Sequence, residues 1–98
     1  MKWVEVIEFR SFNKDEALLE LDFWNCLSAA IEEVDIVKIE VYNHSTLTTD
    51  ISIHLHYDSA QVENQGSLLG LCLVSELKAL GVVNHTVWVE KFATKTLQ

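Results

Sequence analysis

Alternation of apolar and polar side chains is the clearest pattern in this chain, and it predicts strands. In segment 51–59, "ISIHLHYDS", every second residue from Ile51 to Tyr57 is apolar and the residues between them are polar. Successive side chains of a strand point to opposite faces, so this segment is expected to bury one row and expose the other. Segments 3–9, 35–44 and 82–92 are rich in β-branched and aromatic residues and predict three further strands.

Two other segments repeat apolar residues at steps of three and four, which is the spacing of one helix face. The first helix is predicted over 14–34, with Asn13 as its N-cap and acidic residues in its first turn. The second is predicted to begin at Ser67 and to stop at Gly81. Gly70 in its first turns costs about 1 kcal/mol relative to alanine, which indicates either close packing or a frayed start. The apolar face of the first helix comprises Leu18, Leu21, Trp24, Leu27, Ile31 and Val34.

The elements follow one another as βαββαβ, which predicts an α+β fold of the ferredoxin-like kind. Such a fold has a four-stranded antiparallel sheet with two helices on one face, and we expect the strand order 4-1-3-2. The 98 residues are the size of one compact domain, so we take 1–98 as a single domain. Segment 51–59, the third strand in sequence, would then lie in the middle of the sheet.

One face of such a two-layer fold is covered by helices and the other is left open. We expect the apolar rows of the last three strands to face the helices and their polar rows to lie on the open face. The first strand does not decide its own facing, so Trp3 and Glu5 are candidates for either side. The residues predicted to face the helices are Val37, Ile39, Val41, Ile51, Ile53, Leu55, Tyr57, Val87 and Val89. The candidate ligand-binding or interface residues on the open face are His54, His56, Asp58, Tyr42, Trp88 and Glu90.

A tryptophan on an open sheet face indicates that something covers that face. Trp88 is expected in this position, and a second copy of the chain is the most economical cover, because two-fold homodimers are the commonest oligomers. Two sheets facing each other would enclose a partly polar cavity. We therefore expect self-association through the open face, with a small organic molecule as a further partner.

His54 and His56 have the spacing at which two imidazoles on one strand can bind a single metal ion, because their Cα atoms are about 7 Å apart. Glu90 or Glu5 could supply an oxygen ligand to complete the site. No second histidine-rich segment supports it, and His85 is expected near a strand end. The expected cofactor is therefore none, and a metal at His54 and His56 is the alternative that the sequence leaves open.

The same residues permit two roles without a metal. Imidazole exchanges protons near neutral pH, so His54 or His56 could act as acid or base on a molecule held between the apolar walls of Trp3, Tyr42 and Trp88. The polar side chains could instead form hydrogen bonds across a subunit interface or hold water there. Sequence alone does not separate these roles.

The net negative charge of the chain disfavours nucleic acid and anionic membranes as partners. The chain has 7 Lys and Arg against 15 Asp and Glu, a formal charge of −8, so its field repels phosphate backbones and anionic lipid. We expect neither nucleic acid nor membrane as partner. No apolar run approaches the roughly 20 residues of a membrane span, and the first ten residues alternate with acids where a signal peptide would be continuously apolar. A cytoplasmic location is expected.

Cys26 and Cys72 lie in the two predicted helices and do not form a C-x-x-C motif. Without such spacing or a secretory context, they are predicted to be free and buried thiols.

The βαββαβ order, the length and the ending "NHTVWVEKF" resemble the dimeric α+β barrel superfamily, which includes antibiotic-biosynthesis-type monooxygenases and stress-responsive barrel proteins. The resemblance covers residues 1–92 and is one of layout. It implies two ferredoxin-like subunits packed sheet to sheet, with small molecules between the sheet and the helices or within the barrel. No catalytic motif of one family matches, so no residue role is transferred.

Two functions remain open at this point. The first is binding of a small organic ligand or substrate, with oxygenase-like activity as the resemblance implies. The second is a non-catalytic dimerisation or regulatory module without a ligand.

Overall fold

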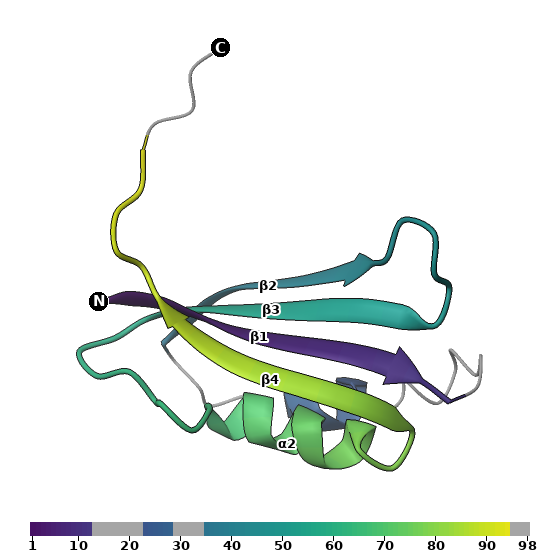
Figure 1. The fold of residues 1–98 in the computed structure, drawn as a ribbon. Helices are drawn as coiled ribbons and strands as arrows, with labels where there is room; N and C mark the ends of the chain where they lie inside the picture. Colours follow the sequence, from purple (N-terminus) through teal and green to yellow (C-terminus); the bar gives the residue numbers. More distant parts are fainter. Residues whose placement is uncertain (13–22, 29–34, 95–98) are drawn as a thin grey trace.

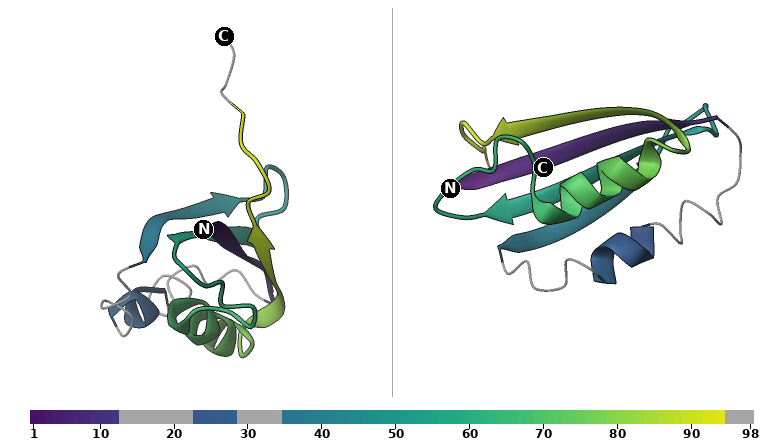
Figure 2. Two further views of the ribbon diagram at one scale, coloured as in Figure 1. Left: turned by 90° about the vertical axis from the view of Figure 1, so that its left-hand side faces the viewer. Right: turned by 90° about the horizontal axis from the view of Figure 1, so that it is seen from below.

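The computed structural model describes residues 1–12, 23–28 and 35–94, and it has the predicted ferredoxin-like architecture. The strands are β1 (Lys2–Ser11), β2 (Ile36–Asn43), β3 (Asp50–Asp58) and β4 (Gly81–Val89). They form one antiparallel sheet in the order β2-β3-β1-β4, so β3 and β1 are central as predicted (Figure 1). Helix α2 (Leu68–Leu77) and the helical residues 23–28 lie on the same side of this sheet (Figure 2).

The core lies between the sheet and these helices. The apolar row of β3 points into it, with Ile53, Leu55 and Tyr57 buried as predicted. In β1 the buried residues also alternate, which places Trp3 and Glu5 on the helix side. The facing that the sequence left undecided is thereby resolved, and neither Trp3 nor Glu5 belongs to the open face.

The outer strands are less buried than predicted. Ile39 and Val41 pair with Leu55 and Ile53 and so face the helix side, yet they are 37% and 50% exposed. They belong to β2, an edge strand with a neighbour on one side only. Val37 lies at an irregularity in the pairing with β3 and is also exposed, so its predicted burial is wrong. In β4, Val87 packs partly against the core, whereas Val89 is exposed because it ends an edge strand.

The predicted first helix is described only at residues 23–28, which are helical. Asn13, its predicted N-cap, and most of its apolar face lie outside the described residues. Phe23, Cys26 and Leu27 pack into or against the core, and their spacing of three and four defines the buried face. This arrangement turns Trp24 outward, where it is 57% exposed, so its predicted place on the buried face is wrong. No helix in the described ranges is long and apolar enough to cross a membrane.

The cysteines differ from the prediction, because Cys26 and Cys72 form a disulfide. Residues 23–28 and α2 lie side by side beneath the sheet, which brings the two Cα atoms to 5.7 Å (Figure 2). This distance is within the range that a disulfide requires. Their sequence separation of 46 conceals the contact, so spacing rules could not find it.

The start of α2 is as predicted, with Ser67 as N-cap accepting a hydrogen bond from the Gly70 backbone N–H at 3.0 Å. Its end is not, because the helix stops at Leu77 and Gly81 instead begins β4. Close packing at Gly70, one of the two explanations left open, is the correct one: a Cβ added there would overlap the carboxylate of Glu5.

Candidate functional site

On the open face, a compact polar cluster forms where β3 pairs with β2. Glu40 lies directly across from His54 in the strand register. Its Oε1 is 2.6 Å from His56 Nε2, and its Oε2 accepts a hydrogen bond from the Tyr42 hydroxyl at 2.5 Å. One ligand atom from each of Glu40, His54 and His56 can be chosen so that all lie within 4.8 Å of one another. The cluster could hold a metal ion or exchange protons with a ligand.

The six residues predicted for this face divide into two groups. His54, His56 and Tyr42 meet in the cluster around Glu40, and the Tyr42 and His54 rings are 5.0 Å apart. Asp58, Trp88 and Glu90 lie toward the other end, where they border a hollow of about 550 Å³ together with His56.

The second group has simple local contacts. Asp58 accepts from the amino terminus at 3.2 Å, and the Trp88 indole donates to Thr86 Oγ1 at 2.9 Å. Trp88 is 60% exposed, which agrees with its predicted place on the open face.

The carboxylate that joins the two histidines was not among the candidates. Glu5, one of the two suggested third ligands, is on the opposite face of the sheet and is excluded. Glu90 is not part of the compact group of Glu40, His54 and His56. The predicted polar row on the open face of β2 contained the signal, because the antiparallel register sets Glu40 opposite His54.

Glu40 is held in its charged form by its neighbours. The Tyr42 hydroxyl, then His56 and then Lys38 stabilise the carboxylate and lower its pKa to about 2. The same contact raises the pKa of Tyr42, since its hydroxyl proton is shared with a carboxylate. Near neutral pH the cluster therefore presents an anionic oxygen beside two imidazoles.

Replacing Glu40 with glutamine is expected to make the free energy of unfolding depend less on pH between about 4.5 and 2. The folded pKa of about 2 is below the reference value of 4.5, so the stabilisation is complete above pH 4.5 and is lost as the pH falls toward 2. Urea midpoints measured across this window, with a chelator present, should converge for wild type and Glu40→Gln at low pH and differ above it. Urea midpoints that differ between the two proteins by the same amount at every pH would contradict the lowered pKa of Glu40.

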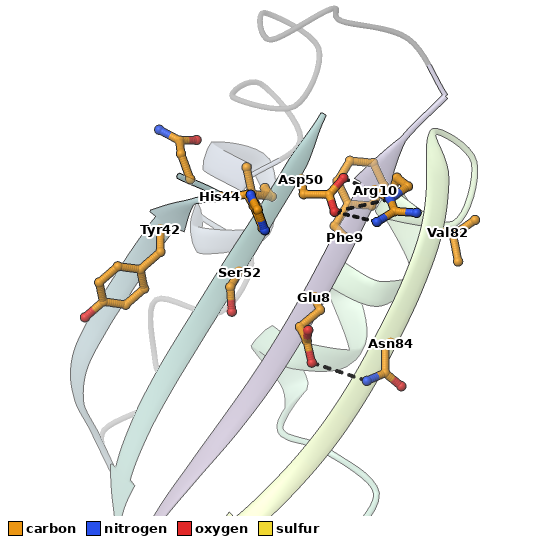
Figure 3. Close-up of a pocket in the computed structure, with 11 residues that line it drawn as sticks. Glu8, Phe9, Arg10, Tyr42, His44, Asp50, Ser52, Val82 and Asn84 are labelled. Carbon is orange, nitrogen blue, oxygen red and sulfur yellow. Dashed lines mark hydrogen bonds and ion pairs between the residues drawn. The ribbon is translucent and has the colours of Figure 1, made fainter. Parts of the chain in front are cut away.

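A second hollow on the open face, of about 320 Å³, lies where β2 ends and β3 begins, and Figure 3 shows the side chains that line it. Arg10 lies over its rim and binds Asp50 through Nε and a terminal nitrogen at 3.0 and 2.9 Å. This pairing raises the pKa of Arg10 and lowers that of Asp50. Glu8 and Asn84 form the other polar pair. Because Asp50 pairs with Arg10, the lining residues that the structure describes offer no unpaired Lys or Arg side chain to an anionic ligand.

A buried polar network lies on the other side of the sheet, at the start of α2, and the sequence did not reveal it. Glu5 is 0% exposed, and its Oε1 accepts hydrogen bonds from Ser67 Oγ at 2.6 Å and Ser67 N at 3.2 Å. Its Oε2 lies 2.5 Å from His85 Nε2. The Tyr57 hydroxyl donates to Ser67 Oγ at 2.6 Å. His85, expected near a strand end, is in the middle of β4 and faces inward.

Two glycines make room for this network. Gly70 in α2 passes directly over the Glu5 carboxylate. Gly66 has a φ of +112°, which side-chain-bearing residues rarely adopt, and a Cβ there would lie 2.6 Å from His85 Cε1. The run "GSLLG" around Ser67 was the available signal, since two glycines flanking a helix start indicate a close approach by another group.

A hollow of about 570 Å³ adjoins the network between the sheet and the start of α2. Trp3 and Tyr57 contribute to its wall and stack with ring centroids 4.3 Å apart. Ser67 and Gly66 also line it, so the hollow is bordered by the same residues that enclose Glu5 and His85. An aromatic wall with a few converging polar groups is typical of a site for a small organic molecule.

Comparisons with solved structures support the fold. SnoaB, a cofactor-independent oxygenase from Streptomyces nogalater, superimposes with a TM-score of 0.71 at 15% identity over 98% of this chain and 96% of its own. Rv0793 from Mycobacterium tuberculosis gives 0.70 at 15% identity, over 97% and 100%. A candidate antibiotic biosynthesis monooxygenase from Deinococcus radiodurans gives 0.68 at 12%, over 98% and 99%. No protein-family model and no curated protein sequence matches the chain. At these identities the likeness establishes the fold.

Proposed function

We propose that this protein binds a flat, electron-rich organic molecule in the hollow beside α2 and oxidises it with O₂ without a cofactor. The observation that carries the proposal is the buried Glu5–His85 pair beside a hollow walled by Trp3 and Tyr57. The fold shared with SnoaB, itself described as a cofactor-independent oxygenase, supports the same reaction class.

The network provides the base that such a reaction needs. Removing a proton from an activated CH₂ group leaves an electron-rich carbanion, which can pass electrons to O₂ directly. Conversion of that CH₂ to a carbonyl consumes one O₂ and releases one water, so no external reductant is required. Tyr57 donates to Ser67 and Ser67 donates to Glu5, so a proton taken from the ligand can pass along this chain to the carboxylate and His85.

The proposal includes a homodimer formed through the open face. Tyr42, Val82 and Trp88 are large apolar side chains that this face leaves exposed. A second copy packed sheet to sheet would bury them and would also close the hollow that contains Trp88 and His56. The same exposed side chains favour the alternative function, a dimerisation module without a ligand.

The substitution Glu5→Gln is expected to lower the rate of O₂ consumption by about 100-fold or more, because it removes the base and keeps the shape. The assay would use an oxygen electrode and a panel of polycyclic phenols that carry an activated CH₂ group, with ligand binding followed by quenching of tryptophan fluorescence. Glu8→Gln is the matched control, since Glu8 lies on the same strand but on the open face. It should leave both readouts unchanged.

The results of this assay distinguish the oxygenase from the dimerisation module without a ligand. Retained binding with lost O₂ consumption in Glu5→Gln supports the oxygenase, and an unchanged rate overturns the role of Glu5. If no panel member quenches fluorescence while light scattering gives the mass of two chains, the dimerisation module replaces the oxygenase.

A further inference from the structure

We propose that Glu40, His54 and His56 form a binding site for a divalent transition-metal ion of the zinc class on the open face of the sheet. The site is distinct from the proposed oxygenase hollow, because Glu5, Ser67 and His85 lie on the opposite face. It goes beyond the proposed function and does not depend on it.

The strand geometry brings the three ligands together. His54 and His56 are two residues apart in β3 and project from the same face, while Glu40 in β2 is directly across from His54. Ligands about 2.0–2.2 Å from a tetrahedral ion are about 3.3 Å from one another. Glu40 Oε1 is already 2.6 Å from His56 Nε2, and all three ligand atoms lie within 4.8 Å. Small side-chain rotations on two rigid strands therefore complete the coordination.

Neighbouring side chains already orient the ligands. The Tyr42 hydroxyl donates to Glu40 Oε2, which leaves Oε1 toward the histidines. Ser52 Oγ is 2.9 Å from His54 Nε2, and the Tyr42 ring lies against the His54 ring. Such outer contacts, which hold metal ligands in place, distinguish a built site from a chance cluster.

The donor set selects the class of ion. Two imidazoles and one carboxylate suit zinc, cobalt or ferrous iron better than magnesium or calcium, which prefer oxygen ligands alone. Three ligands leave the remaining position to water, as in catalytic rather than structural zinc sites. His56 and Glu40 are both partly exposed, so this position is accessible in the single chain.

The positive charge of Lys38 disfavours binding of a metal cation at this site. Its Nζ lies 3.3 Å from Glu40 Oε2, and its ammonium must move away when a cation binds. The Lys38 side chain is largely exposed, so it can do so without disturbing the sheet. A substitution that removes the Lys38 ammonium should therefore strengthen metal binding, whereas substitutions of the ligands should weaken it.

The experiment uses the full chain without a histidine tag, stripped with a chelator and dialysed. Calorimetry with ZnCl₂ should show saturable binding of one ion per chain, and CoCl₂ should give visible absorption bands of a tetrahedral or five-coordinate site. His54→Ala, His56→Ala and Glu40→Gln should each weaken binding by more than about tenfold, since even outer contacts are worth about 10–100-fold. Lys38→Met should tighten it.

His44→Ala is the matched control and should bind zinc as the wild type does, because His44 Nδ1 instead accepts from the backbone of Thr46 and Leu47. Far-UV circular dichroism checks each variant, and His54→Gln and His56→Gln replace any alanine variant that fails to fold. Absence of saturable binding, or equal losses in His44→Ala and the cluster variants, would overturn the proposal. Glu5→Gln should keep the zinc site intact, so failure of the oxygenase proposal would be seen separately.

Discussion

Replacing Gly70 with alanine is expected to lower the free energy of unfolding by about 2–3 kcal/mol, although alanine usually favours a helix over glycine by about 1 kcal/mol. The added Cβ would overlap the buried carboxylate of Glu5, which has no space to withdraw because Ser67 and His85 hold both of its oxygens. Urea denaturation followed by circular dichroism measures the change.

A double-mutant cycle identifies the cause. In a Glu5→Ala background the carboxylate is gone, so Gly70→Ala should become neutral or stabilising by up to about 1 kcal/mol. Ser75→Ala, at an exposed position of α2, is the control for helix propensity and should change stability by no more than about 0.5 kcal/mol. An equal cost of Gly70→Ala in both backgrounds would mean that the overlap with Glu5 is not its origin.

Loss of the Cys26–Cys72 disulfide is expected to lower the free energy of unfolding by about 4 kcal/mol. This value follows from the entropy of closing a loop between cysteines separated by 46 residues in an unfolded chain. Urea curves recorded with and without dithiothreitol measure it. The double variant Cys26→Ser and Cys72→Ser should be as unstable as the reduced protein and should not respond to dithiothreitol. Coincident curves for oxidised and reduced wild type would show that the bond contributes nothing.

The disulfide also bears on the cytoplasmic location expected from the sequence, which stays a prediction. Cytosolic glutathione and thioredoxin keep most thiols reduced, so a structural disulfide is more typical of an oxidising compartment. In the cytosol, Cys26 and Cys72 would be a reduced, packed pair between the two helical segments, and the stability measured with dithiothreitol would be the relevant one.

The two faces of the sheet give this small protein two separate polar centres. Glu5 and His85 are enclosed with Ser67 between sheet and helix, where water is scarce and each polar atom has a partner. Glu40 and the two β3 histidines lie on the open face, where a second chain or a metal ion can reach them. In β3, His56 contacts Glu40 on the open face and its neighbour Tyr57 contacts Ser67 on the other, because successive residues of a strand point to opposite faces.

Local patterns were sufficient for the architecture and for the placement of the β3 histidines. Period-two and period-three-to-four repeats predicted the element order βαββαβ, and the strand order followed from the ferredoxin-like fold that this element order indicates. Ser67 was recognisable as a helix cap because capping depends on neighbouring residues only. His54 and His56 were assigned to the open face because the apolar residues between them needed the core.

The facing of β1, the Glu5 network and the disulfide required the tertiary structure. Both rows of β1 are mixed, and an acid in the buried row is stable only because His85, 80 residues away, and Ser67 supply its partners. Cys26 and Cys72 likewise meet only once both helical segments pack beneath the sheet. Alternation and capping are properties of neighbours in the chain, so the sequence by itself determined them. Burial of the Glu5 carboxyl group and pairing of the cysteines depend on residues brought together from distant segments, so only the folded chain decided them.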